Sequence, residues 1–381
     1  MHLAPCNQNS EQALRESYVN INMVRVIFKS FADLFQPPVF MFVSNHNLKN
    51  LTALVFISLA FFACINDKPA VVTKGPSTPK TTVRQVAVPV FNQDSAYMNI
   101  EKQVNFGPRV PNTDGHRKCA AWLSSEFKRY GLTVIEQKFQ AQHYKGTTFN
   151  CVNIIGQYKP ELPNRILLAA HWDTRFMADQ DSKNTNKPID GADDGGSGVG
   201  ILLELSRVLQ ANPVDIGVDF VLFDAEDQGN DSDDGQDNSR TWCLGAQHWA
   251  KNLHRPGYSP MYGILLDMVG GKNPKFAREG LSRTYAPAIV DKVWNTAASL
   301  GYSNAFVPED GPAITDDHFF VIQIARIPMI DIISRPGETK SGFVKHWHTH
   351  DDNMSAIDKN TLKMVGQTVT AVVYNTYNGV L

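Results

Sequence analysis

The stretch Val218-Asp-Phe-Val-Leu-Phe-Asp-Ala-Glu-Asp-Gln-Gly229 indicates how the chain folds. Its first six residues are mostly apolar, with β-branched and aromatic side chains, which predicts a buried strand. Three acids follow within four positions: Asp224, Glu226 and Asp227. Adjacent carboxylates are costly to remove from water unless a positive charge lies between them. The acids therefore either face water as a polar loop or serve a metal, and this stretch alone leaves both interpretations open.

Similar apolar runs recur along the chain and alternate with helical patterns. The predicted strands cover residues 133–139, 147–155, 165–170, 218–223, 262–268 and 327–333. Helical spacing of apolar residues predicts helices over 95–104, 199–209, 285–300 and 362–374, and another that opens at 113–115 and stops at Gly131. Strands that alternate with helices predict an α/β fold with helices on both faces of one sheet.

Composition sets limits on function. The 381 residues are 43% hydrophobic and 19% charged, which is typical of a globular protein. The net charge of -2 gives no sign of a nucleic-acid-binding surface, so we expect no nucleic-acid partner. The five cysteines show no metal-type spacing.

The N-terminal part of the sequence resembles an export signal. A mostly apolar run of about 13 residues, 51–63, is short for a membrane span and suits a signal-peptide core. Cys64 follows a small residue, as at a bacterial lipoprotein cleavage site, although a plain secretory signal or a buried helix remains open. Met41 is then the natural start, and 1–40 are a probable upstream extension.

The predicted organisation follows from that boundary. Residues 41–63 are a signal peptide, 64–92 a lipidated tether rich in Pro, Thr and Lys, and 93–381 a single catalytic domain. We therefore expect an exported protein in the bacterial periplasm, or a lipoprotein anchored to the outer membrane, that contacts membrane only through its N-terminal lipid.

Histidines and acids gather after three predicted strands and in three loops. The strand ends carry His171 and Asp173, then Glu226 and Asp227, then Asp267; the loops are 193–194, 316–318 and 346–352. Sites in α/β sheets form at the carboxyl ends of the strands. One such cluster could be a solvated loop, or a helix entry capped by Asp194, but six are hard to explain as surface. Carboxylates and imidazoles without cysteines suit a catalytic zinc.

These residues resemble a known family. The motifs Gly191-Ala-Asp-Asp194, Phe223-Asp-Ala-Glu-Asp227, Leu266-Asp-Met-Val-Gly270 and the segment starting at His348 are similar to the zinc aminopeptidase superfamily. Within it, Asp316-Asp-His318 and Trp347-His-Thr349, followed by Asp-Asp-Asn353, resemble the animal-type glutaminyl-peptide cyclotransferases, also called glutaminyl cyclases.

The resemblance implies a fold, a site and an activity. The fold would have a mixed, mostly parallel central sheet flanked by helices on both faces. One zinc per subunit would be bound by Asp194, Asp227 and His348. Glu226 would be the proton shuttle, with Asp267 and Asp316 in a hydrogen-bond network; Trp347 and Phe343 would line the substrate pocket. The implied reaction converts the N-terminal glutamine of peptides or proteins to pyroglutamate and releases ammonia.

The sequence departs from the animal pattern in two places. Asp227 stands where that pattern has Glu, and the following acidic segment lacks a nearby tryptophan, for which Trp242 is the nearest substitute. Two other functions stay open. A zinc aminopeptidase could use His171 for a second metal, and a surface lipoprotein could bind peptides without catalysis.

Overall fold

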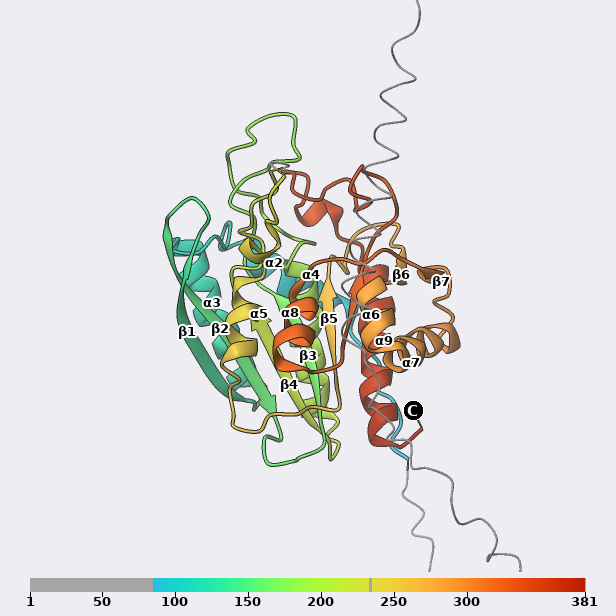
Figure 1. The fold of residues 1–381 in the computed structure, drawn as a ribbon. Helices are drawn as coiled ribbons and strands as arrows, with labels where there is room; N and C mark the ends of the chain where they lie inside the picture. The colour runs from blue at the N-terminus through green and yellow to red at the C-terminus, as the bar shows by residue number, and fades with distance from the viewer. Residues whose placement is uncertain (1–84, 233–234, 381) are drawn as a thin grey trace, which may run out of the picture. The chain divides into compact units, whose positions relative to one another are not determined.

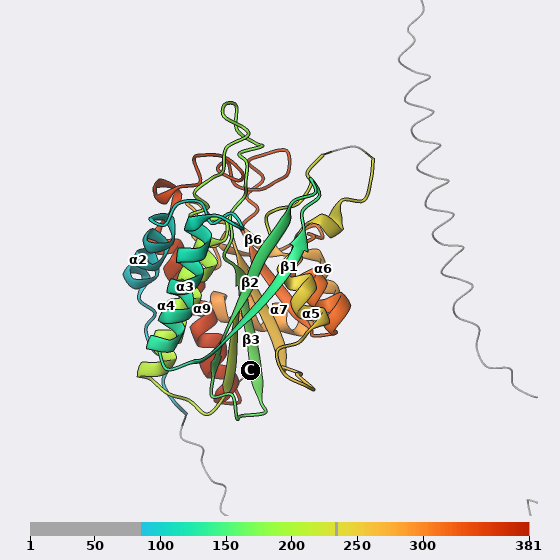
Figure 2. The same cartoon turned by 90° about the vertical axis from the view of Figure 1, so that its left-hand side faces the viewer.

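A six-stranded sheet with the order β1-β2-β4-β3-β5-β8 forms the centre of the fold (Figures 1 and 2). This computed structural model describes residues 85–232 and 235–380. Strand β2 is antiparallel to both of its neighbours, and the other strand pairs are parallel. The predicted mixed, mostly parallel sheet is therefore confirmed. The strands span Thr133–Gln142 (β1), Thr148–Tyr158 (β2), Arg165–His171 (β3), Gly217–Phe223 (β4), Tyr262–Asp267 (β5) and Met329–Ile333 (β8).

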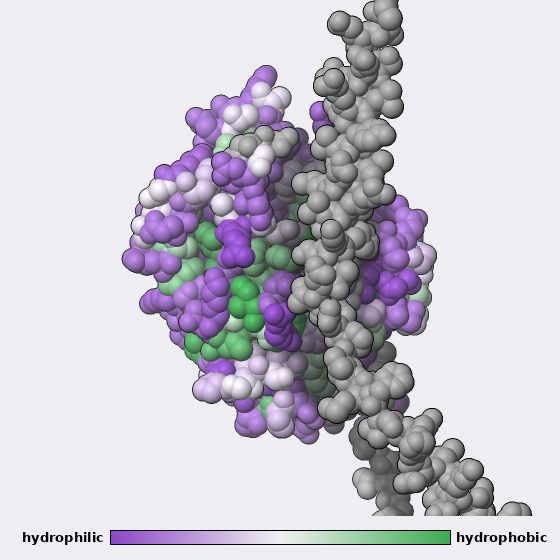
Figure 3. Space-filling view, in the orientation of Figure 1, coloured by the Kyte–Doolittle hydropathy of each residue, from purple (hydrophilic) through white to green (hydrophobic). Residues whose placement is uncertain are grey.

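Helices cover both faces of this sheet. One layer holds α2 (Gln93–Val104), α3 (Asp114–Arg129), α4 (Gly196–Ala211), α7 (Pro287–Ser299) and α9 (Lys359–Tyr377). The other layer holds α5 (Leu244–Lys251), α8 (Asp317–Phe320) and the π-helical turn η2 (Val321–Ala325). On the face shown in Figure 3, hydrophobic side chains gather where Figure 1 places α5 and α8.

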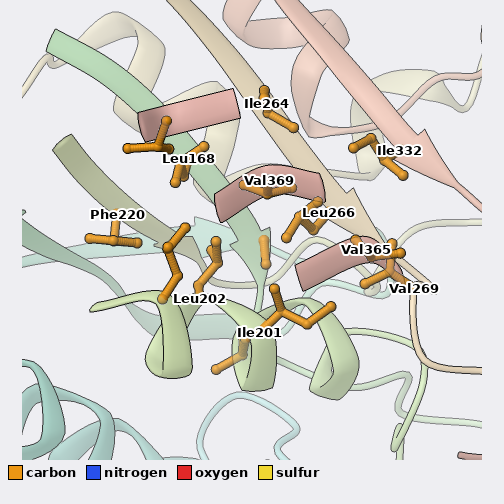
Figure 4. Packing of buried hydrophobic residues seen from close by; sticks show 14 of the residues in the cluster. Leu168, Ile201, Leu202, Phe220, Ile264, Leu266, Val269, Ile332, Val365 and Val369 are labelled. Carbon is orange, nitrogen blue, oxygen red and sulfur yellow. The ribbon is translucent and has the colours of Figure 1, made fainter. Parts of the chain in front are cut away.

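The two layers produce two separate hydrophobic cores. Side chains of Leu168 and Phe220 enter the core beneath α4 and α9, where Figure 4 shows them beside Leu202 of α4. Leu167 and Val221, one position away on the same strands, enter the core beneath α5. Successive strand side chains point to opposite faces, so a strand that is apolar along its whole length must be covered on both sides.

Some elements differ from the sequence prediction. The helix predicted over 285–300 is α7, which begins at Pro287 because Ala286 leaves the helical conformation with φ -141° and ψ 47°. Tyr285 instead ends a separate helix, α6 (Gly280–Tyr285), which was not predicted. Strands β6 (Phe276–Arg278) and β7 (Phe306–Asp310) form a second sheet that was not predicted, because β6 has three residues and β7 contains Pro308. The short 3₁₀ turns are η1 (Ser239–Thr241) and η3 (Met354–Ala356).

Residues 85–92 form an extended strap along α9. The Asn378 side chain hydrogen-bonds both the N–H and the C=O of Val86. The Gln367 side chain accepts from the N–H of Phe91 and donates to the C=O of Pro89. Composition alone places these residues in the tether, yet they lie against the domain because two amide side chains satisfy their backbone.

The predicted signal peptide and Cys64 lie outside the described residues. Among the residues that are described, no helix has both the length and the apolar character needed to cross a membrane.

Candidate active site

The carboxyl ends of the parallel strands meet at one edge of the sheet. His171 ends β3, Asp267 ends β5, and Glu226 and Asp227 follow β4 by a few residues. Asp194 lies in the turn before α4. This is the edge at which α/β sheets form their sites, and the side chains that the sequence places there do come together.

Asp194, Asp227 and His348 form one compact group. His348 Nε2 lies 3.0 Å from Asp227 Oδ1 and 3.9 Å from Asp194 Oδ2. One donor atom from each of the three lies within 4.8 Å of the others, and all three residues are buried. Asp227 Oδ2 is buried without a hydrogen-bond partner. One imidazole and two carboxylates with a free oxygen are a donor set that fits zinc with a position left open.

A second group shares Asp194 with the first. His171 Nε2 lies 3.0 Å from Asp194 Oδ1 and 3.1 Å from Asp267 Oδ1, and these donors also lie within 4.8 Å of one another. Burial raises the pKa of Asp267 to about 7, against the opposing effect of His171. Asp194 is thus placed between two sets of potential ligands. The sequence placed His171 at this edge through its position at the end of a predicted strand, and the resemblance to two-metal peptidases offered it as a ligand of a second metal.

Glu226 faces the pocket and belongs to neither group. Burial raises the pKa of Glu226 well above its usual value; His171 opposes this, and Asp316 and Asp227 add to it. The Cys243 thiol donates to Glu226 Oε1 at 3.2 Å, and the Cys243 N–H donates to the Glu226 carbonyl. A carboxyl with a raised pKa can both accept and return a proton near neutral pH. The sequence offered no indication of this role for Cys243, because the cysteines were considered only as possible metal ligands.

Asp316 completes a buried group of acids behind Glu226. Asp316 caps α8 by accepting from the N–H of Asp317 at 2.5 Å. Asp317 and Asp331 are fully buried, and their carboxylate oxygens have no hydrogen-bond partner. Burial raises the pKa of both carboxyls well above the usual value. A carboxylate oxygen of Asp331 lies within 4.8 Å of one of Asp316, and its signal in the sequence was a single acid inside an apolar strand. The hydrogen-bond network expected for Asp267 and Asp316 stays a prediction.

Strained backbone surrounds these side chains. Ala225, Cys243, Met268 and His348 have φ of 54°, 55°, 45° and 55°. Non-glycine residues with positive φ cost free energy and concentrate at functional sites. Here His348 is itself a candidate ligand, Ala225 and Met268 adjoin Glu226 and Asp267, and Cys243 hydrogen-bonds to Glu226. The surrounding structure must therefore hold the site in place.

A cavity of about 400 Å³ opens onto this group. Its wall includes the three aromatic residues chosen from the sequence: Trp347, Phe343 and Trp242. The Trp347 ring stacks on His348 with centroids 3.9 Å apart, and Phe343 lies 4.9 Å from Trp347. Trp242 lies parallel to His348 at 6.0 Å. The pocket thus combines acids and the His348 imidazole with aromatic rings, two of which stack on that imidazole.

His348 has a further partner that sequence reasoning missed. Asp179 Oδ1 lies 3.0 Å from His348 Nδ1, and Arg175 pairs with the same carboxylate. A carboxylate at the second ring nitrogen fixes the orientation of a metal-binding imidazole. Asp179 lies in a polar loop with no motif, which explains why it gave no signal.

Comparison with known proteins assigns the chain to a family. Residues 153–373 match the model of peptidase family M28. Glutaminyl cyclase from Tannerella forsythia is 51% identical, with a TM-score of 0.74, over 75% of this chain and 99% of that structure. A Zn-dependent exopeptidase from Parabacteroides distasonis is 50% identical, with a TM-score of 0.74, over 76% of this chain and 100% of that structure.

A curated relative extends the comparison to a peptidase. Aminopeptidase YwaD from Bacillus subtilis is 26% identical over 82% of this chain, and the match spans 63% of YwaD. The relatives thus include both cyclases and peptidases with one fold. The chain belongs to peptidase family M28, and it fits among the glutaminyl cyclases of the zinc aminopeptidase superfamily.

Proposed function

We propose that this protein is a zinc-dependent glutaminyl cyclase, which converts the N-terminal glutamine of peptides or proteins to pyroglutamate and releases ammonia. One observation carries the proposal. Glu226, a carboxyl with a raised pKa, lines the same cavity as the His348 group and the aromatic residues. Glutaminyl cyclases among the structures similar to this chain support the choice of reaction.

Asp194, Asp227 and His348 are the proposed zinc ligands. Their buried carboxylates need a compensating positive charge, and the free Asp227 Oδ2 is available to supply a ligand oxygen. A zinc ion bound there would act as a Lewis acid on the γ-amide carbonyl of the glutamine. The pocket itself would hold the side chain folded toward its own α-amine, which supplies the proximity that ring closure needs.

Glu226 has the proposed role of moving the proton. In the ring-closing step the α-amine nitrogen bonds to the side-chain carbonyl carbon Cδ, and the bond from Cδ to the amide nitrogen breaks. Glu226 takes a proton from the attacking amine and gives one to the departing ammonia, so it ends in its starting state. Asp267 and Asp316 would hold the neighbouring hydrogen-bond network, while Trp347, Phe343 and Trp242 exclude water from the substrate.

A second candidate function is a zinc aminopeptidase. The group of His171, Asp194 and Asp267 favours it, because two ligand sets that share one carboxylate suit two metal ions. Glu226 would then activate water rather than the substrate amine. The two functions share every residue of the pocket and differ in their products.

The products decide between the two. The purified enzyme is incubated with a Gln-Xaa peptide and with leucine anilide, and the products are analysed by mass spectrometry together with an ammonia assay. We expect ammonia and a peptide that is lighter by one ammonia, with its peptide bonds intact. Release of free glutamine or leucine without a pyroglutamyl product would contradict the cyclase and favour the peptidase.

We also propose that the protein is exported and anchored through Cys64. The support is the apolar run 51–63 and the cysteine that follows it. Mass spectrometry of protein extracted from membranes should find an acylated Cys64 at the N-terminus. Unmodified protein that starts near Met1 would contradict this proposal.

A further inference from the structure

Asp352 is a fully buried carboxylate outside the proposed ligand set. Its Oδ1 accepts the backbone N–H of Asp193 at 2.8 Å, and its Oδ2 accepts the N–H of Asp194 at 3.1 Å. Both carboxylate oxygens of Asp352 therefore accept hydrogen bonds from the backbone segment that carries the proposed ligand Asp194. Without them, two buried N–H groups would lack partners, which costs free energy.

This contact joins two ligand segments that are far apart in sequence. Asp352 belongs to the turn that carries His348, since its N–H donates to the carbonyl of Thr349. It reaches residues 158 and 159 positions earlier in the chain. The Asp352 carbonyl also accepts from Ala192 at 3.3 Å. The positions of Asp194 and His348 are thus coupled through one side chain rather than set by each loop separately.

Asp173 makes the same contact with the other ligand segment. Its Oδ1 accepts the N–H of Glu226 at 2.9 Å, and its Oδ2 accepts the N–H of Asp227 at 3.2 Å. The Gln228 amide donates a third hydrogen bond to it. Asp173 follows His171 by two residues, as Asp352 follows His348 by four. Each of the two proposed aspartate ligands is therefore held at its backbone by the carboxylate of an aspartate that lies close in sequence to a site histidine.

We propose that Asp352 and Asp173 are positioning residues that set the geometry of the metal site before an ion binds. Each carboxylate holds two consecutive amides, which fixes the peptide plane and hence the direction of the adjoining aspartate side chain. The inference rests on the ligands named for the proposed function, and it concerns how these are held rather than the reaction. Sites held in this way retain their shape without the ion.

The wild-type protein provides the first test. Hydrogen exchange, resolved to single amides by mass spectrometry, is measured on the whole enzyme with zinc and after treatment with a chelator. The amides of 193, 194, 226 and 227 should stay protected in the zinc-free protein. Exchange at these amides as fast as in exposed loops after zinc removal would refute the proposal, and this comparison needs no variant to fold.

Asp352→Asn provides the second test. The asparagine side chain keeps one acceptor oxygen, and its NH₂ group would face the second backbone N–H. One of the two hydrogen bonds to the N–H groups of Asp193 and Asp194 is therefore lost. We expect faster exchange at 193 and 194, unchanged exchange at 226 and 227, and zinc affinity weaker by about 10- to 100-fold in a chelator competition assay. Asp351→Asn is the matched control, because Asp351 is the exposed neighbour in the same turn, and it should bind zinc like the wild type.

These readouts separate this inference from the proposed function. Asp352→Asn with wild-type zinc affinity and wild-type exchange would overturn the positioning role. A wild type that binds zinc and keeps these amides protected, yet releases free amino acids, would remove the cyclase and leave the positioning role in place.

Discussion

Replacing Glu226 with glutamine tests the proposed proton shuttle most directly. The amide keeps the size of the side chain and an oxygen for the Cys243 thiol. The backbone contacts of residue 226 with Asp173 and Cys243 are unaffected, so the neighbouring ligand Asp227 should keep its place. Only the ability to accept a proton is lost.

The size of the loss follows from the surroundings of this carboxyl. Removal of a general acid–base group costs about 10²–10⁴-fold in rate. A carboxylate oxygen of Asp316 lies within 4.8 Å of a Glu226 oxygen, so part of the proton transfer can pass to it. We therefore expect a loss of about 10³-fold in kcat, which equals about 4 kcal/mol of transition-state stabilisation. Glu226→Gln combined with Asp316→Asn should lose still more.

The assay is ammonia release from a Gln-Xaa peptide at saturating substrate, with zinc measured in the same samples. Zinc content should match the wild type. Glu101→Gln serves as a control, because Glu101 is an exposed acid on α2. A Glu226→Gln enzyme that carries full zinc and keeps more than about a tenth of the wild-type kcat would refute the role assigned to Glu226.

Three further changes test other parts of the structure. His348→Ala removes a proposed ligand and should abolish both bound zinc and turnover; zinc retained at full occupancy would contradict the ligand set. Trp347→Ala removes the ring stacked on His348, so we expect weaker substrate binding, seen as a higher KM of about tenfold, with zinc unchanged; unchanged kinetics would remove Trp347 from the pocket. Burial alone would raise the pKa of Glu279, but hydrogen bonds from His318 and from backbone N–H groups outweigh it, so the pKa falls from 4.5 to about 2. A carboxyl whose pKa is lower in the folded state stabilises the fold at pH values above its unfolded pKa, and this stabilisation is lost as the pH falls. In urea unfolding, the wild type should therefore lose stability between about pH 4.5 and 2, and Glu279→Gln should lose less. Equal losses of stability in the two proteins would contradict this role of Glu279.

The strand-end motifs were visible in the sequence because each follows an apolar run. An acid directly after a buried strand, as with Asp267, must lie at the carboxyl edge of the sheet, and parallel strands bring those edges together. The order of the strands and the pairs they form could not be derived in the same way. The antiparallel position of β2 depends on which neighbour it meets, which no local pattern records.

The supporting contacts could not be predicted, because they depend on distance in space. Asp352 meets Asp193 across 159 residues, and Cys243 meets Glu226 across 17. Asp179 sits in a loop without a periodic pattern. Asp331 is visible in the sequence, since an acid between two isoleucines in a strand is unusual. The sequence does not indicate which residues this acid contacts.

The strap along α9 begins at the end of the helix that is remote from the pocket. Helix α9 starts beside the catalytic edge, where the Asp358 N–H donates to Gly270, and it ends at the opposite edge, where Thr376 meets Tyr262 at the start of β5. Val86 is held at that far end by Asn378, so the chain enters the domain at the pole remote from the pocket. Residue 85, where the described part of the chain begins, therefore lies at the end of α9 remote from the pocket, and the strap can be altered without contact to the substrate.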